Sequence, residues 1–178
     1  MLEKQAAKGY FDLYFADATK FSQQGYVPYG WQFNDEQVYI EVCRGKSINC
    51  FGLLARNNQF IYRTSTKNVN AAFVLETLEK LSFQLSKTTV IVLDNARVHT
   101  ARKIKERLRI WQKRGLYVFY LPPYSPHLNI IERLWKEMKQ AWIKPKDYQT
   151  ADTLFYAVNL VCAAIGNSLF LNFSKTSF

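Results

Sequence analysis

The sequence is poor in the residues that build thiolate metal sites, disulfide frameworks and flexible linkers. It has 3 cysteines, 2 histidines, 7 glycines and 5 prolines among 178 residues. Cys43, Cys50 and Cys162 form no Cys-x-x-Cys pair, which excludes a zinc ribbon, and their odd number predicts a reducing, cytosolic compartment. With 48% apolar and 16% aromatic residues, the composition excludes disordered and fibrous classes and predicts one globular domain over residues 1–178.

Several catalytic and targeting signatures are also missing. The sequence has no Gly-x-x-x-x-Gly-Lys or Gly-x-Gly-x-x-Gly loop and no Gly-x-Ser-x-Gly elbow, which argues against an ATPase, a dinucleotide enzyme and a serine hydrolase. Residues 1–9 contain charges and no apolar segment, so no secretion signal is predicted. Residues 153–174 are uncharged and long enough to cross a bilayer, but Gly166-Asn167 is typical of a helix end. A buried helix and no membrane contact are therefore predicted.

Positive charge is concentrated in one part of the chain. Lys and Arg number 24 against 14 Asp and Glu, a formal charge of +10. Residues 97–146 hold 13 of the basic side chains and only 3 of the acidic ones, whereas basic and acidic side chains balance elsewhere. A solvated helix face normally mixes both signs, so this asymmetry favours a polyanionic partner, with nucleic acid preferred over a membrane.

The order of apolar patterns predicts an α/β fold with a mixed sheet. The early strands can pair antiparallel, whereas the later strands are separated by amphipathic helices, and such crossovers produce parallel neighbours. Helices are expected on both faces of the sheet. The expected strands span residues 10–16, 36–43, 48–54, 59–63, 88–93 and 116–121, and the expected helices span residues 70–85, 100–113, 128–143 and 151–165.

Two aspartates follow the strands with the strongest patterns. Asp17 comes after residues 10–16 and Asp94 after residues 88–93. Ligands gather at the carboxyl ends of parallel strands, so the two carboxylates meet there if the strands are neighbours. A divalent cation with a preference for oxygen ligands, Mg²⁺ or Mn²⁺, would offset their repulsion. The alternative is that each aspartate only caps the segment that follows it.

A third carboxylate, Glu132, is expected near the start of the helix over residues 128–143. It borders the apolar stripe formed by residues such as Trp135 and Met138, so it is expected beside the core. Its alternative role is a capping box with Asn129, three residues earlier.

These residues lie within motifs that resemble a known family. The segments Val-Leu-Asp94-Asn95-Ala-Arg-Val-His99 and Leu-Pro-Pro-Tyr-Ser-Pro-His-Leu-Asn129-Ile-Ile-Glu132-Arg-Leu-Trp135-Lys-Glu-Met-Lys are similar to the catalytic domain of insertion-sequence transposases of the mariner-like DDE superfamily. The block Phe-Ala-Asp17, with Pro-Tyr-Gly-Trp-Gln at residues 28–32, resembles the same family's first-aspartate block.

The resemblance implies an RNase H-like fold, a five-stranded sheet with antiparallel early strands and parallel later strands. It implies that Asp17, Asp94 and Glu132 are catalytic and bind two Mg²⁺ ions, with Mn²⁺ as a substitute. The implied activity is hydrolysis and strand transfer at phosphodiester bonds of transposon ends, with double-stranded DNA as partner, in the bacterial cytoplasm and nucleoid.

The basic stretch between residues 97 and 146 is expected to form the DNA-facing wall of the cleft. The expected DNA contacts are Arg97, His99, Arg102, Lys105, Arg109, Lys136 and Lys139. Several roles stay open. His99 either contacts DNA, orients a metal-bound water or holds the turn into the next helix. Tyr124 either stacks on a base or packs, and Lys136 and Lys139 either contact phosphate or neutralise Glu132. Asn95, Tyr124 and Asn129 are expected as accessory residues.

The sequence departs from the family pattern at Ala18, His127 and Ile130, none of which removes a proposed ligand. The helix-turn-helix modules that read transposon ends in this family are not found, which suggests a fragment, a separately encoded recognition domain or a degenerate copy. A homodimer is a further expectation. Two rival functions remain: a nuclease or resolvase on the same fold that cleaves without joining, and a catalytically silent DNA-binding remnant.

Overall fold

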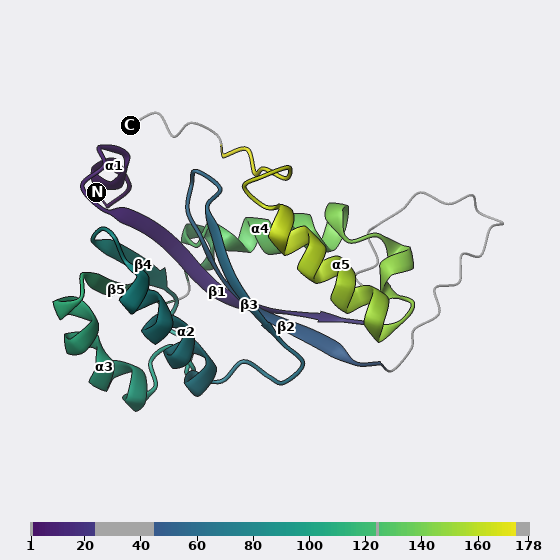
Figure 1. Cartoon of the computed structure of the whole chain (residues 1–178), viewed down its shortest axis with the longest axis horizontal. Helices are drawn as coiled ribbons and strands as arrows, with labels where there is room; N and C mark the ends of the chain where they lie inside the picture. Colours follow the sequence, from purple (N-terminus) through teal and green to yellow (C-terminus); the bar gives the residue numbers. More distant parts are fainter. Residues whose placement is uncertain (1, 24–44, 124, 174–178) are drawn as a thin grey trace.

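The centre of the molecule is a five-stranded sheet with the strand order β3-β2-β1-β4-β5 (Figure 1). The computed structural model describes residues 2–23, 45–123 and 125–173. The strands are β1 (Asp12–Ser22), β2 (Ser47–Leu54), β3 (Phe60–Ser65), β4 (Thr89–Leu93) and β5 (Leu116–Tyr120). β2 runs antiparallel to β1 and β3, while β4 runs parallel to β1 and β5. The predicted mixed sheet is confirmed, and the strand expected at residues 36–43 lies outside the described residues.

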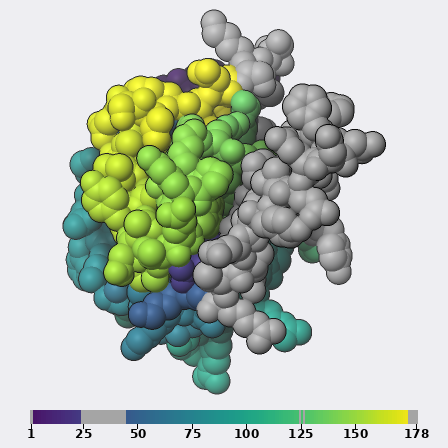
Figure 2. Space-filling model, turned by 90° about the vertical axis from the view of Figure 1, so that its right-hand side faces the viewer, coloured from purple at the N-terminus to yellow at the C-terminus, as the bar shows by residue number. Residues whose placement is uncertain are grey.

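Helices cover both faces of this sheet, as predicted. α2 (Ala71–Gln84) and α3 (Arg102–Lys113) pack on one face, and α4 (Ile131–Glu137) and α5 (Ala151–Ala164) pack on the other. Figure 2 shows the green and yellow surface of α4, α5 and the segment after α5 lying above the blue and teal surface of earlier elements. The shorter elements are α1 (Leu2–Ala7), η1 (Pro126–Leu128), η2 (Met138–Trp142) and η3 (Pro145–Tyr148).

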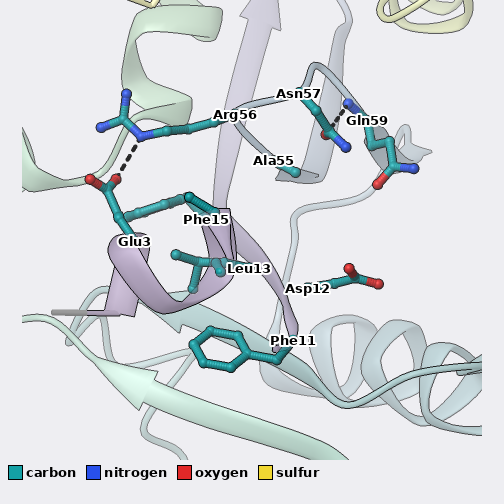
Figure 3. Close-up of a pocket in the computed structure, with 11 residues that line it drawn as sticks. Glu3, Phe11, Asp12, Leu13, Phe15, Ala55, Arg56, Asn57 and Gln59 are labelled. Carbon is teal, nitrogen blue, oxygen red and sulfur yellow. Dashed lines mark hydrogen bonds and ion pairs between the residues drawn. The ribbon is translucent and has the colours of Figure 1, made fainter. Parts of the chain in front are cut away.

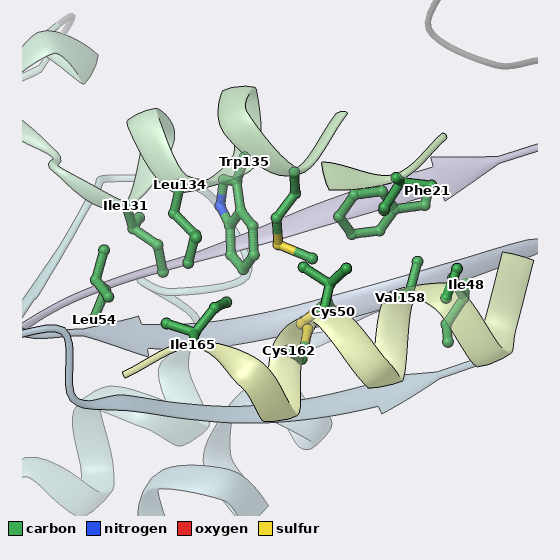
Figure 4. Packing of buried hydrophobic residues seen from close by; sticks show 14 of the residues in the cluster. Phe21, Ile48, Cys50, Leu54, Ile131, Leu134, Trp135, Val158, Cys162 and Ile165 are labelled. Atoms are coloured by element: carbon green, nitrogen blue, oxygen red, sulfur yellow. The ribbon is translucent and has the colours of Figure 1, made fainter. Parts of the chain in front are cut away.

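The alternation of side chains along β1 decides which helix each residue faces. Tyr14 and Ala16 pack with α2 and α3, whereas Phe21 packs with α4 and α5. Asp17 is four residues before Phe21 and therefore projects from the same face, toward α4. Figure 4 shows the core on this side, where α4 and α5 meet β1 and β2 through Phe21, Ile48, Cys50, Leu54, Ile131, Leu134, Trp135, Val158, Cys162 and Ile165.

Three boundaries differ from the sequence-based expectations. β1 does not end before Asp17 but continues to Ser22. The pairing with β4 ends at Ala16, whereas β2 pairs with β1 from Phe15 to Ser22 and so extends the strand. α4 begins only at Ile131, since the proline-containing η1 turn precedes it, and a π-helical turn, η2, replaces its last part. The helix α1 was not expected.

The uncharged segment forms α5, which ends just before Gly166 as predicted. Gly166 has a φ of 79°, and a Cβ there would lie 2.5 Å from the backbone oxygen of Asn58. Glycine is the residue that tolerates both conditions, so it stops the helix without strain. Within the described part of the chain, no helix combines the length and hydropathy needed to cross a bilayer.

One carboxylate binds α3 to α2. Glu79 of α2 accepts hydrogen bonds from Arg107, from the Trp111 indole at 2.8 Å and from Arg114 at 2.7 Å. The hydrogen bonds from Arg107 are the largest cause that lowers the pKa of Glu79, to about 2. Arg107 and Arg114 belong to the basic stretch, so part of that stretch serves the fold and is neutralised within it.

Glu79→Gln is expected to lower the free energy of unfolding by about 1 kcal/mol at pH 7, because the ion pairs to Arg107 and Arg114 are lost. Since the folded pKa of Glu79 lies below its ordinary value of 4.5, this stabilisation is present above pH 4.5 and disappears as the pH falls toward about 2. Urea unfolding at several pH values measures the difference. The exposed Glu76→Gln is the control, and equal stability of Glu79→Gln and the unchanged chain at pH 7 would contradict the assignment.

Candidate active site

Asp17 and Asp94 come together because their strands are parallel neighbours. In the β1–β4 pairing, Ala16 lies opposite Leu93, so the next residue on each strand is one of the two aspartates. Ligand atoms of Asp17, Asp94 and His99 all lie within 4.8 Å of one another. The sequence-based expectation that the two carboxylates meet at the edge of the β1–β4 pairing agrees with this geometry.

Asp94 is held by its own loop. Its Oδ1 accepts a hydrogen bond from the backbone N–H of Ala96 at 3.0 Å and lies 2.5 Å from Nδ1 of His99. The hydrogen bond from His99 is the largest cause that lowers the pKa of Asp94, so this carboxyl is ionised at neutral pH. The contact with Ala96 is the local capping role that was the alternative for Asp94. Both hydrogen bonds use Oδ1, and within the described part of the chain Oδ2 of Asp94 has no hydrogen-bond partner.

His99 does not lie on the surface as a DNA contact would require. Its side chain is 1% exposed and its ring lies 5.9 Å from that of Phe51. The backbone oxygen of His99 accepts a hydrogen bond from the Tyr120 hydroxyl at 3.0 Å. The predicted DNA contact at His99 is therefore wrong, because the turn after β4 folds this side chain inward onto Asp94.

Asp17 is the carboxyl group of the pair whose pKa is raised. Its pKa is raised to about 6, with burial as the largest cause and the negative charges of Glu132 and Asp94 as further causes. The indole Nε1 of Trp135 donates a hydrogen bond to Oδ2 of Asp17 at 3.2 Å. Sequence reasoning placed Trp135 in the apolar stripe and missed this contact, for which the sequence holds no signal because 118 positions separate the two residues.

Glu132 lies in the first turn of α4 and is exposed, so the expected position beside the core is wrong. It is not part of the group whose ligand atoms lie within 4.8 Å, although its charge acts on Asp17. It borders a groove lined also by Trp135, Lys136, Lys139 and Gln140.

The capping box expected for Asn129 and Glu132 is not formed. Asn129 is buried, and its Nδ2 donates to the backbone oxygen of Ala16 at 3.2 Å, so its side chain reaches β1 and not the start of α4. Ile130 is the residue before α4 and makes no side-chain cap. Asn129 therefore positions α4 against β1.

Asn95, the other accessory residue on the described chain, bridges two loops. Its Nδ2 donates to the backbone oxygen of Leu121, which connects the turn after β4 to the segment after β5. Asn95 also lines a groove with Asp94, Ala96, Pro122, Pro123 and Ser125. Tyr124 lies outside the described residues.

The basic side chains do not form one wall. Arg102, Lys105 and Arg109 are exposed on α3, on the face that α2 covers, and Arg102 pairs with Glu106 at 2.7 Å. Lys136 and Lys139 lie on the opposite face, beside Glu132. The expectation of a single DNA-facing wall is wrong, because α3 and α4 pack on opposite sides of the sheet.

Lys139 and Arg97, two of the expected DNA contacts, have distinct surroundings. Lys139 lies 5.5 Å from the centre of the Phe21 ring, and its burial lowers its pKa, while the charges of Glu132 and Asp17 oppose that effect. Arg97 is exposed in the loop after β4. Arg97 follows Asp94 by three residues, and Lys139 follows Glu132 by seven.

A different cavity, of about 200 Å³, lies between α1, β1 and the β2–β3 turn (Figure 3). Its lining includes Phe11, Leu13 and Phe15, and the ion pair between Glu3 and Arg56 at 2.7 Å borders it. None of the three proposed catalytic carboxylates lines it. It lies toward the start of β1, whereas Asp17 lies beyond the stretch of β1 that pairs with β4.

The residues gathered around Asp17 fit a divalent cation. Asp17 and Asp94 offer carboxylate oxygens, which hard divalent cations prefer, within reach of one another. The raised pKa of Asp17 shows that burial and the neighbouring anions are not offset by the protein alone. A bound cation would offset that repulsion, and Glu132 is the further carboxylate within electrostatic reach.

Comparison with known proteins finds a matching family model and one relative. The model of a family described as DDE superfamily endonuclease matches residues 12–155, a range that contains all three carboxylates. An uncharacterized protein of Sinorhizobium fredii, y4pE/y4sA, is 31% identical over 75 residues, which are 42% of this chain and 49% of that protein. The chain thus spans about half the length of this relative.

Solved structures share the fold. The Mos1 mariner paired-end complex with Mn is similar over 92% of this chain and 52% of that chain, with a TM-score of 0.64 and 18% identity. The catalytic core domain of BIV integrase is similar over 89% of this chain and 85% of that chain, with a TM-score of 0.54 and 15% identity. These likenesses show the RNase H-like fold that the motif resemblance implied.

Proposed function

The chain belongs to the DDE superfamily endonuclease family, and from this premise we propose that it is the catalytic domain of a DNA transposase. In this proposal it hydrolyses phosphodiester bonds at transposon ends and transfers the resulting strands. The observation that carries the proposal is the meeting of Asp17 and Asp94 at the edge of the β1–β4 pairing, with Glu132 acting on Asp17 from α4.

The family implies the use of divalent metal. We propose that Asp17, Asp94 and Glu132 hold two Mg²⁺ ions, for which Mn²⁺ substitutes. When bound, such ions supply an activated oxygen nucleophile and stabilise the leaving oxygen of an in-line displacement. The buried indole of Trp135 excludes water from one side of Asp17. His99 holds Asp94 ionised, so this ligand needs no proton loss at neutral pH.

Double-stranded DNA is the proposed substrate, and the basic side chains on both faces support this proposal. Arg97, Lys136 and Lys139 are the proposed phosphate contacts nearest the carboxylates. Arg102, Lys105 and Arg109 of α3 are proposed to contact phosphates farther along the duplex. Such contacts position the DNA backbone and carry little sequence information.

The test of the proposal is cleavage and joining of DNA by the full chain. Supercoiled plasmid should be nicked in Mg²⁺ or Mn²⁺ and left intact in EDTA, and a labelled oligonucleotide with a free 3′-hydroxyl should become joined to the plasmid. Nicking without joining would favour a nuclease or resolvase. Metal-independent DNA binding with no nicking would indicate a silent remnant.

DNA binding by this chain is expected to be nearly indifferent to sequence and to weaken steeply with salt. About five phosphate contacts give a slope near −4 to −5 in log K against log [salt]. Changing Arg102, Lys105 and Arg109 together to Gln should reduce the magnitude of the slope by about 2 to 3, because each lost phosphate contact removes about 0.9. Fluorescence anisotropy at a series of salt concentrations measures it.

The control for this experiment changes Lys4, Lys8 and Lys80 to Gln, which removes the same charge from other parts of the surface. The control should keep the slope of the unchanged chain. An equal loss in both triple variants would show that overall charge alone drives binding, and salt-independent binding would show that the basic side chains have been misassigned.

A further inference from the structure

Trp135 connects the helix that carries Glu132 to the strand that carries Asp17. Its side chain is 3% exposed, and its indole N–H donates to Oδ2 of Asp17 at 3.2 Å. Trp135 follows Glu132 by three residues on α4. A single side chain thus relates two of the proposed metal ligands, which come from different elements.

The place of the indole is fixed by its surroundings. The rings of Phe60 and Phe21 meet it edge-on, with centres 6.0 and 6.5 Å away. Gly52 lies opposite Asp17 in the β1–β2 pairing, and a Cβ there would lie 2.8 Å from Cη2 of Trp135 and 2.6 Å from Cε2 of Phe60. The missing side chain at Gly52 therefore provides the space that lets the indole reach Asp17.

A second hydrogen bond connects the segment just before α4 to β1, one residue before Asp17. Asn129 donates to the backbone oxygen of Ala16, the residue before Asp17. The two bonds attach α4 to β1 at consecutive residues. The contact between Trp135 and Asp17 therefore helps to hold Glu132, on α4, in its position relative to Asp17.

We propose that Trp135 is a positioning residue for divalent-metal binding. By engaging Oδ2 of Asp17, the indole fixes the orientation of this carboxylate and holds α4, which carries Glu132, against β1. This inference rests on the proposed function, because it takes the three carboxylates as the metal site. Groups that orient metal ligands in this way typically contribute about 10- to 100-fold to metal affinity.

The experiment compares two indole-to-phenyl changes in the full chain. Trp135→Phe keeps an aromatic ring in the core and removes the N–H donor. Trp111→Phe is the matched control, because Trp111 is 0% exposed and also donates its indole N–H to a carboxylate, Glu79, but on the opposite face of the sheet. Isothermal titration with Mn²⁺ measures affinity, and thermal melts in EDTA measure stability.

Trp135→Phe is expected to weaken Mn²⁺ binding by about 10-fold or more, and Trp111→Phe is expected to leave it unchanged. Equal Mn²⁺ affinity in Trp135→Phe and the unchanged chain would overturn the inference while leaving the proposed function intact. An equal loss in both variants would also overturn it, since it would reflect general damage to the core. Absence of Mn²⁺ binding by the unchanged chain would refute the proposed function together with the inference.

A measurement on the unchanged chain covers the case in which Trp135→Phe does not fold. In a ¹⁵N-labelled sample, Mg²⁺ is expected to shift the indole N–H resonance of Trp135, because its acceptor becomes a metal ligand. The Trp111 indole resonance should stay in place. A Trp135 resonance that does not move at saturating Mg²⁺ would contradict the inference.

Discussion

Asp94→Asn should abolish metal-dependent nicking by the full chain while leaving the fold intact. The amide keeps the size of the side chain and an oxygen that accepts from the Ala96 N–H, but it lacks the negative charge that a divalent cation needs. Nicking in Mg²⁺ and Mn²⁺ should fall to the level seen in EDTA. The melting temperature should change by only a few degrees, because about 1 kcal/mol of hydrogen bonding is affected.

The control for this change is Asp12→Asn. Asp12 is on β1 as well, but it lies at the beginning of the strand and pairs with Lys87 at 3.3 Å. It should keep full nicking activity. If Asp94 only capped its turn, Asp94→Asn would change the stability little, because asparagine caps about as well as aspartate, and it would spare the activity. This outcome would contradict the assignment of Asp94 as a ligand.

Asp17→Asn should have two opposite effects: it should stabilise the metal-free protein and abolish its stabilisation by Mn²⁺. The folded pKa of Asp17 is about 6, above its ordinary value of 3.8. The contribution of the Asp17 carboxyl to the free energy of unfolding is therefore fully present below pH 3.8. It is lost as the pH rises through about 6, because the buried carboxyl then becomes charged. Asparagine carries no charge, so it removes a cost of up to about 3 kcal/mol at pH 7.5.

Thermal melts of Asp17→Asn and the unchanged chain, at pH 4 and pH 7.5 and with EDTA or Mn²⁺, separate these effects. In EDTA, the variant should melt several degrees higher at pH 7.5 and at nearly the same temperature at pH 4. Mn²⁺ should raise the melting temperature of the unchanged chain and not that of the variant. A variant that is less stable than the unchanged chain in EDTA at pH 7.5, or that Mn²⁺ still stabilises, would contradict the assignment of Asp17 as a metal ligand.

The parts of the fold that the sequence predicted are those with strong local patterns. The β-branched run of β4 and the helical spacing in α2 and α5 each indicate one element without reference to the rest of the chain. Crossover helices then require parallel neighbours, which is enough to bring Asp94 close to Asp17. The three carboxylates were found because they also belong to motifs with family-specific spacing.

The parts that the sequence did not predict depend on contacts between distant residues. β1 continues past Asp17 because β2 pairs with it, and no local pattern announces that pairing. The burial of His99 follows from the path of the loop after β4. Trp135 has the spacing of a core residue, and only the packed structure, with Gly52 opposite Asp17, shows that its indole reaches the carboxylate.

The distribution of charge shows the same limit. The sequence locates the positive excess in residues 97–146 but does not indicate on which face each helix packs. In the structure α3 and α4 lie on opposite faces of the sheet, and Arg107 and Arg114 are bound to Glu79. A count of charges along the chain therefore overstates the basic surface beside the carboxylates.

The most direct test of the account is a crystal of this chain soaked in Mn²⁺ and measured at an X-ray wavelength where manganese scatters anomalously. We expect anomalous density between the carboxylates of Asp17 and Asp94, with Glu132 turned toward it from α4. Well-ordered carboxylates at Asp17 and Asp94 without anomalous density between them, in crystals that bind Mn²⁺ elsewhere, would contradict the central claim that these residues form the metal site.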